Sequence, residues 1–220
     1  MDIKTIISDI NSIENGFQHI LNAAEQIAKT YTEDEYYPLA FELFEHDAYQ
    51  TRMLSVCLLG YLAIHNGTAL NFLKETVSHD GNWRVQEMLA KSFDYICKIR
   101  GYENSLPLIT EWINDNNPNV VRAVTEGLRI WTSRPYFKEH PTTAIALLSQ
   151  HKSNPSEYVR KSVGNALRDI SKRYPQLVLD EFAYWDLTDK KLRQTYQLAI
   201  KALNSHPLKS QFLRDIVLTH

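Results

Sequence analysis

Apolar residues recur along almost the whole chain at helical spacing, and long alternating runs of β-branched residues are absent. Intervals of three and four residues place apolar side chains on one face of a helix. Clusters of Pro, Gly, Asn and Asp interrupt the pattern, as at Asp80-Gly81-Asn82 and Asp115-Asn116-Asn117-Pro118. We therefore expect an all-α protein with helices over residues 15–31, 33–45, 48–65, 68–78, 82–99, 103–114, 118–131, 141–150, 156–173, 176–184 and 188–204.

One helical segment recurs along the chain. Its copies are NWRVQEMLAKSFDYI from Asn82, VVRAVTEGLRIW from Val120 and YVRKSVGNALRDISK from Tyr158. Superposing Val85, Val124 and Val163 spaces the copies by 39 residues, close to the period of HEAT and armadillo repeats. Helical hairpins of this kind bury their apolar faces by stacking. We predict a HEAT-like helical-hairpin solenoid, an α-α superhelix with a concave groove.

Short loops make neighbouring helices antiparallel, and five or six helix pairs fill the sequence. We expect residues 1–220 to form a single repeat domain. Residues 1–32 are expected to form a helical cap at its N-terminal end.

The repeat register predicts which side chains share an outer face. Each copy has a Val and a Leu four residues apart, expected in the core: Val85 and Leu89, Val124 and Leu128, Val163 and Leu167. The residue two beyond each Val lies about 200° further around the helix, on the solvent side. These residues are Glu87, Glu126 and Asn165. The same alignment places Asp169 one turn beyond Asn165. The pattern therefore predicts a strip of carboxylates along the groove.

Aromatic and basic residues accompany this strip. Trp83, Arg122 and Lys161 lie one turn before its three positions, and further basic residues flank it: Arg84, Arg129, Arg160, Arg168, Lys172 and Arg173. Clustered carboxylates facing a basic groove suit chemistry on a polyanion in which positive charge develops.

The same residues also have an ordinary structural interpretation. Arg122 and Glu126 fit an ion pair across one helical turn, worth about 0.3–0.5 kcal/mol. Asp169 and Arg173 have the same spacing, and the tryptophans at 83 and 131 fit a hydrophobic core. Both interpretations remain open from the residues alone.

Composition narrows the function classes. The formal net charge is −2, but residues 1–80 carry 4 Lys/Arg against 12 Asp/Glu and residues 81–220 carry 20 against 14. Such asymmetry fits an anion-binding face on one part of the protein, and it fits equally well solvated helix faces whose charges happen to cluster. Cys57 and Cys97 lie in apolar helical stretches and are expected to be buried free thiols. HExxH, CxxC and glycine-rich phosphate-binding motifs are absent, so we expect no metal and no cofactor.

The sequence also bears on location. It lacks the run of about 18 apolar residues that spans a bilayer, and its N-terminus MDIKTIISDINSIENG is acidic where a signal peptide is basic and then apolar. We expect a cytoplasmic protein that does not contact a membrane.

Three segments resemble a known family: NWRVQEMLA, NPNVVRAVTEGLRIWTSRPYF and SEYVRKSVGNALRDISKRYP. They are similar to the DNA alkylation repair superfamily of HEAT-like repeat proteins, typified by the AlkC and AlkD alkylpurine DNA glycosylases. The resemblance covers roughly residues 35–205. It implies a monomer that binds alkylated double-stranded DNA in its groove and hydrolyses the N-glycosidic bond of cationic 3- or 7-alkylpurines.

The resemblance also implies roles for individual residues. The catalytic carboxylates would be Glu87, Glu126 and Asp169, which stabilise an oxocarbenium-like sugar and orient water. The substrate contacts would be Trp83, Asn165 and Trp131. The contacts to DNA phosphates would be Arg84, Arg122, Arg129, Arg160, Lys161, Arg168 and Lys172.

Two departures from the family pattern leave an alternative open. The AlkD pattern has Asp where this chain has Glu87, and an aromatic residue where it has Asn165. A non-catalytic HEAT-like scaffold that binds DNA or a protein partner on the same surface fits the sequence as well.

Overall fold

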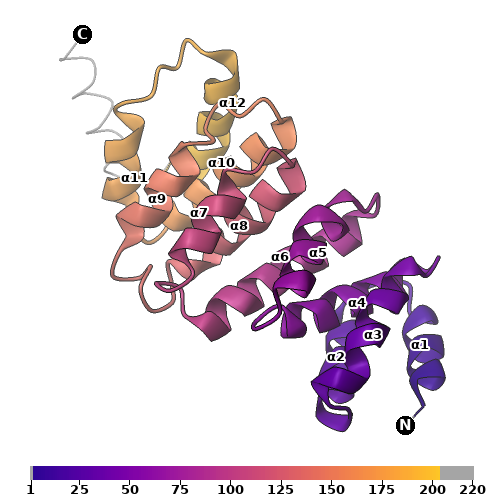
Figure 1. Ribbon diagram of the computed structural model, residues 1–220. Helices are drawn as coiled ribbons and strands as arrows, with labels where there is room; N and C mark the ends of the chain where they lie inside the picture. Colours follow the sequence, from indigo (N-terminus) through magenta and orange to yellow (C-terminus); the bar gives the residue numbers. More distant parts are fainter. Residues whose placement is uncertain (1, 204–220) are drawn as a thin grey trace. The chain divides into compact units, whose positions relative to one another are not determined.

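The computed structural model describes residues 2–203 (Figure 1). Within these residues it contains twelve α-helices and no β-strand, which confirms the all-α prediction. The chain divides into two compact units, called here unit 1 (Met1–Gly101) and unit 2 (Tyr102–His220). None of the helices in residues 2–203 combines the length and apolar character needed to cross a membrane.

Unit 1 is built around α4. Its helices are α1 (Ile3–Asn11), α2 (Gln18–Thr30), α3 (Glu33–Glu42), α4 (Tyr49–Leu62), α5 (Gly67–Glu75) and α6 (Trp83–Arg100), with 3-10 turns at Leu43–Glu45 and Val77–His79. Helix α4 packs against α2, α3, α5 and α6. Nearly all its side chains are therefore buried, including Met53, Leu54 and Leu58.

Unit 2 repeats the hairpin plan. Its helices are α7 (Leu106–Ile113), α8 (Pro118–Trp131), α9 (Pro141–Ser149), α10 (Glu157–Ser171), α11 (Pro175–Phe182) and α12 (Lys190–Ala199), followed by the 3-10 turn η3 (Ile200–Leu203). Helix α10 packs against α8 on one side and α12 on the other. Helices α8 and α10 carry the predicted site residues of this unit, with Lys172 at the end of α10.

The expected helices all occur; their ends shift by up to three residues, except that the last helix, α12, ends at Ala199 and continues as the 3-10 turn η3. Helix α1 was not predicted. Its signals are present in the sequence, since Ile3, Ile6 and Ile10 share one face and the Asp2 side chain accepts a hydrogen bond from the Lys4 backbone N–H. The last expected helix extends to residue 204, which lies outside the described residues.

A recurring turn determines where the second helix of a hairpin begins. Asp80, Asp115 and Asn154 each lie three residues before the first residue of α6, α8 or α10. Each side chain accepts a hydrogen bond from the backbone N–H two residues further on, at 2.7, 2.7 and 2.9 Å respectively. An Asx turn of this kind satisfies loop backbone groups just before the helix.

A side chain from the fourth position of the helix closes the same turn. Arg52 of α4, Gln86 of α6 and Arg160 of α10 each donate to the carbonyl oxygen three residues before their own helix, at 2.9, 2.7 and 2.6 Å. The loop and the first helical turn are thus held together. We call this arrangement the turn clamp.

Close packing of α10 on α12 depends on Gly164. A Cβ atom at this position would lie 2.7 Å from Leu198 Cβ and 2.9 Å from the Thr195 carbonyl oxygen, which is backbone and cannot rotate away. We expect Gly164→Ala to lower the free energy of unfolding by about 1–2 kcal/mol, because overpacking costs more than the better helix propensity of Ala returns. Urea denaturation measures this.

Gly67→Ala is the matched control. Gly67 begins α5, and a Cβ there would meet nothing within 4 Å. Its replacement should leave stability unchanged or raise it by up to about 1 kcal/mol. Equal stability of the two variants would contradict the packing argument.

Candidate functional site

The residues expected in the repeat core are buried. The side chains concerned are Val85 and Leu89, Val124 and Leu128, Val163 and Leu167, all 0% exposed. Glu87, Glu126 and Asn165 are half-buried on their helices. The division of each helix into an inner and an outer face is therefore confirmed.

The register of the first copy is wrong by about one helical turn. Helix α6 begins two residues before Val85, whereas α8 and α10 begin six residues before Val124 and Val163. The Asx-turn residues Asp80, Asp115 and Asn154 give the same result, since they are separated by 35 and then 39 residues. Leu89 thus occupies the helix position of Val124 and Val163.

This correction changes which side chains are equivalent. Glu87 is the fifth residue of its helix, the position that Arg122 and Lys161 occupy in α8 and α10. Lys91, at the ninth position, corresponds to Glu126 and Asn165. The three carboxylates predicted for one strip therefore do not share a repeat position.

In unit 1 an exposed aromatic residue begins α6. Trp83 is 60% exposed, and the guanidinium carbon of Arg84 lies 4.6 Å from its ring centroid and 5.1 Å from that of Tyr49. Arg84 also donates through Nη2 to Asn15 Oδ1 at 3.4 Å. Cation–π contacts hold the guanidinium against both rings.

The next turns of α6 carry one acidic and one basic side chain. Glu87 is half-buried, one turn beyond Trp83. Lys91 is half-buried too, with its ammonium 4.1 Å from the ring centroid of Phe17. This part of unit 1 thus offers an exposed indole, a carboxylate and two cations that rest on aromatic rings.

In unit 2, Glu126 is held by three neighbours. Its Oε1 accepts a hydrogen bond from Ser162 Oγ at 2.8 Å and lies 3.9 Å from Arg122 Nε. Its Oε2 lies 3.4 Å from Arg129 Nη1. The ion pair between Arg122 and Glu126 that their spacing allows is therefore formed.

Asp169 is held more tightly still. Its carboxylate accepts hydrogen bonds from Arg129, from Arg168 Nε at 3.3 Å and from Lys172 Nζ at 2.6 Å. Burial alone would raise the pKa of Asp169, but the hydrogen bonds from Lys172, Arg168 and Arg129 outweigh it and lower the pKa to about 2. Asp169 and Glu126 share Arg129, which joins them into one network across α8 and α10.

Burial removes two predicted DNA contacts from the surface. Trp131 is 0% exposed and packs on Tyr102 and Phe137, with ring centroids 5.2 and 5.6 Å away. Arg160 is 7% exposed and forms the turn clamp of α10, and it also donates to Gln194 Oε1 at 2.7 Å. Their side chains stabilise unit 2 from within, so we leave both out of the proposed interface.

Lys161 is exposed and pairs with Glu157 across one helical turn, at 2.7 Å. Exposed pairs of this kind are worth little, so Lys161 is available to a stronger anion.

The network in unit 2 carries an excess of positive charge, since Arg122, Arg129, Arg168 and Lys172 surround two carboxylates. An arrangement of this sign attracts anions, and arginine forks match phosphate geometry. Within residues 2–203 no three His, Cys, Asp or Glu side chains are grouped to hold a metal ion. Cys57 and Cys97 are buried as free thiols, as expected.

The sequence analysis did not identify Lys91, which lies on α6 beyond Glu87, or Ser162, the buried hydrogen-bond partner of Glu126. Correct alignment of Asp80 with Asp115 would have placed Lys91 beside Glu126 in the repeat. Ser162 carried no comparable signal, because its contact with Glu126 arises only from the packing of α10 on α8.

Comparison with known proteins agrees with this architecture. A family model described as DNA alkylation repair enzyme matches residues 18–195. The crystal structure of AlkD2 from Streptococcus mutans is similar to the chain at a TM-score of 0.88 and 46% identity, covering 92% of this chain and 99% of that one. The crystal structure of smu.31 from Streptococcus mutans UA159 has a TM-score of 0.84 and 45% identity, covering 91% and 98%.

A curated relative is the uncharacterized protein YhaZ of Bacillus subtilis (strain 168), which is 32% identical over 107 residues. That match covers 45% of this chain and 30% of YhaZ, so the chain matches less than a third of the length of that relative. The solved structures confirm the predicted helical-repeat fold over nearly the whole chain.

The charge network predicts a pH-dependent contribution of Asp169 to stability. Its pKa is lowered on folding, so the contribution is complete above the ordinary pKa of 3.8 and disappears as the pH falls toward about 2. We expect Asp169→Asn to destabilise the protein by about 1–2 kcal/mol at pH 7 and progressively less between about pH 4 and 2. Urea denaturation at a series of pH values measures the difference.

Asp180 of α11 provides the control, since it is an exposed carboxylate bonded only to Gln176 in the described structure, at 2.7 Å. Its change to Asn should alter stability by less than about 0.5 kcal/mol at any pH. A difference for Asp169→Asn that does not vary with pH would refute the assigned role of this network.

Proposed function

Because the chain belongs to the DNA alkylation repair enzyme family, we propose that it acts in repair by binding duplex DNA that carries alkylated purines. The single observation that carries this proposal is the cationic network of α8 and α10. DNA presents a dense row of phosphates, and neutralising them supplies most of the affinity of a DNA-binding protein. The protein would act as a monomer, without metal or cofactor, in the cytoplasm.

The carboxylates of the network have a defined part in this proposal. Glu126 and Asp169 fix the directions of Arg129, Arg168 and Lys172 before DNA arrives. Preorganised side chains lose less conformational entropy on binding. Four cations remain against two carboxylates, so the network keeps a net attraction for phosphates.

Recognition of the lesion is assigned to unit 1. An indole that is 60% exposed is a large apolar surface, and Arg84 beside it brings positive charge. Aromatic faces suit contact with a deoxyribose or a nucleobase. We therefore keep Trp83 as the proposed substrate contact in unit 1.

Base excision is the proposed chemical step. The bond between the purine nitrogen and C1′ would break, its electron pair would neutralise the cationic base, and water would add to C1′ and release one proton to the solvent. Glu87 is the carboxylate proposed to stabilise the developing charge on the sugar, because it lies one helical turn from the exposed indole of Trp83. Glu126 and Asp169 suit this task less, since arginine and lysine already compensate their charges.

The neutralisation of Glu126 and Asp169 by arginine and lysine also favours a second function, which is DNA binding without base excision. A protein of this kind would recognise alkylated DNA and leave the chemistry to another enzyme. The two functions share the same DNA-binding surface and differ only in whether Glu87 acts on the sugar.

A base-release assay on duplex DNA containing 7-methylguanine distinguishes them. If the chain excises bases, Glu87→Gln should slow release by about 100-fold or more at unchanged DNA affinity, because it removes the charge and keeps the shape. Asp180→Asn, which changes an exposed carboxylate of α11, is the control and should release at the wild-type rate. Wild-type protein that binds this DNA but releases no base would establish the non-catalytic function.

DNA affinity tests the binding surface itself. Lys172→Gln should weaken binding several-fold at low salt and reduce the slope of log K against log salt by about 1, because one phosphate contact is lost. Lys29→Gln in unit 1 removes an equally exposed lysine that pairs with Glu25 and should change neither quantity. Fluorescence anisotropy with a labelled duplex at several salt concentrations measures both. The proposal fails if wild-type protein does not bind duplex DNA at about 50 mM salt.

A further inference from the structure

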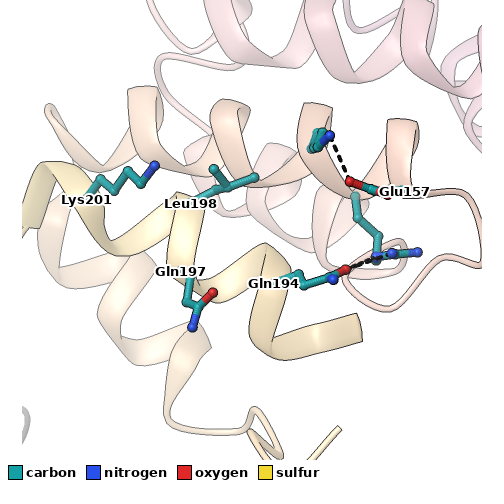
Figure 2. A pocket seen from close by; sticks show the side chains of 7 residues that line it. Glu157, Gln194, Gln197, Leu198 and Lys201 are labelled. Carbon is teal, nitrogen blue, oxygen red and sulfur yellow. Dashed lines mark hydrogen bonds and ion pairs between the residues drawn. The ribbon is translucent and has the colours of Figure 1, made fainter. Parts of the chain in front are cut away.

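A hollow of about 270 Å³ lies between α10 and α12, at the end of unit 2 away from α8 (Figure 2). Its walls are formed by Glu157, Arg160, Lys161, Gln194, Gln197, Leu198 and Lys201. Figure 2 shows Gln194, Leu198 and Lys201 following one another along one helical edge, with Glu157 facing them from α10. None of the functions argued above uses this hollow.

The hollow is cationic. Arg160, Lys161 and Lys201 face a single carboxylate, Glu157. Glu157 pairs with Lys161 at 2.7 Å, and the guanidinium of Arg160 is occupied by the turn clamp and Gln194. Lys201 is exposed and forms no ion pair within residues 2–203. Its ammonium is thus the group left for an added anion.

Amide donors accompany these cations. Gln194 Oε1 accepts from Arg160 Nε at 3.2 Å and from Nη2 at 2.7 Å. Its acceptor end is thereby fixed, so its N–H groups are the end that a ligand in the hollow can use. Gln197 offers a second amide on the same helix. A site with ammonium and amide donors suits an anion with several acceptor oxygens, such as a phosphate group.

The repeat register connects Lys201 with the cationic network. Arg129, Arg168 and Lys201 each lie eleven residues after the first residue of α8, α10 or α12. Arg129 and Arg168 lie within their helices, and Lys201 lies in the 3-10 turn η3 that follows α12 directly, so the three residues have similar places in three successive hairpins. The residue in this place is basic in each of the three hairpins.

The three helices run in parallel, so this row is also a row in space. Thr125 contacts Ser162 and, four residues further on, Arg129 contacts the Asp169 of α10. Across the next interface Arg160 contacts Gln194, and Gly164 lies against Leu198. Packed helices have axes about 8–10 Å apart, which spaces the row in steps of that size.

The acidic partners disappear along the same row. The ninth helix position is Glu126 in α8, Asn165 in α10 and Leu198 in α12. The carboxylate that orients arginine in the first hairpin is thus replaced by an amide and then by an apolar side chain. Positive charge is least compensated at α12.

We propose that the hollow binds a phosphate group of the DNA backbone, the next one along the strand beyond those held by Arg129 and Arg168. The inference rests on the proposed DNA-binding function and extends its surface to α12. Lys201 supplies the charge, Gln194 and Gln197 donate to the phosphate oxygens, and Leu198 contacts the adjoining deoxyribose. The hollow adds affinity without reading sequence, because phosphates carry no sequence information.

Lys201→Gln tests this assignment in the full chain. We expect it to weaken binding to a 20-base-pair duplex by about fivefold at low salt and to lower the salt slope by about 1. Lys190→Gln is the control, since Lys190 is an exposed lysine at the start of the same helix and lies outside the hollow. It should leave both values unchanged. Thermal melting of both variants at the wild-type temperature shows that the fold is retained.

Duplex length provides a second measurement. Shortening the duplex until it no longer reaches α12 should weaken wild-type binding and abolish the difference between wild type and Lys201→Gln. The inference is overturned if Lys201→Gln binds the long duplex like Lys190→Gln while wild-type protein binds DNA normally. That outcome leaves the proposed function intact, whereas failure of wild-type protein to bind any duplex refutes both.

Inorganic phosphate distinguishes a backbone contact from a site for a free anion. For a backbone contact, inorganic phosphate and the duplex compete for the hollow, so phosphate should weaken wild-type binding at least as much as chloride does at the same ionic strength, and Lys201→Gln should remove any excess over chloride. If phosphate binds in calorimetry and Lys201→Gln abolishes that binding without affecting DNA affinity, the hollow is a small-anion site and the inference is wrong.

Discussion

In these helical hairpins, hydrogen bonds between the second helix and the loop before it determine the residue at which that helix begins. In α4, α6 and α10 the fourth residue donates to a loop carbonyl, and in α6, α8 and α10 an Asx turn precedes the helix. These bonds satisfy backbone groups that a tight interhelical loop would leave without partners. Because they fix the first residue of the helix, they also fix which later residues face the core and which face solvent.

This constraint explains why Arg160 is a structural residue although it lies among predicted phosphate contacts. Its guanidinium is only 7% exposed and is used by the loop and by Gln194. The equivalent residue of α6 is Gln86, which performs the same task without charge. A basic residue at this position therefore says nothing about an anionic ligand, whereas a basic residue at the twelfth position faces outward and does.

In unit 2, Glu126 and Asp169 hold the basic side chains around them in place. Asp169 has a pKa of about 2 because three basic side chains stabilise its ionised form, and Glu126 shares Arg129 with it. A carboxylate in such surroundings is a poor stabiliser of a further positive charge but a good anchor for guanidinium groups. Glu87 of unit 1 lies one helical turn from the exposed indole of Trp83. The proposed division of labour between the carboxylates follows from these different neighbours.

The sequence by itself determined the fold class, the helices from α2 onward, the buried Val/Leu faces and the family, because these depend on local periodicity and on short motifs. It also indicated a basic surface, since charge is visible in composition. Tertiary structure decided the rest. A 39-residue alignment matched Val85 to Val124 although their helices begin at different distances before them, and only the loop contacts revealed this.

Burial and pairing were likewise beyond the sequence. Trp131 and Arg160 carry the chemistry of a DNA contact, but Tyr102 and Phe137 pack on Trp131, and Gln194 of α12 holds Arg160. Asp169 was expected to act on a substrate, or else to pair with Arg173, and instead it binds Arg129 from the neighbouring helix. The contacts of Arg160 with Gln194 and of Arg129 with Asp169 join residues 34 and 40 positions apart. Their existence depends on how one hairpin packs against the next, and no local pattern specifies that.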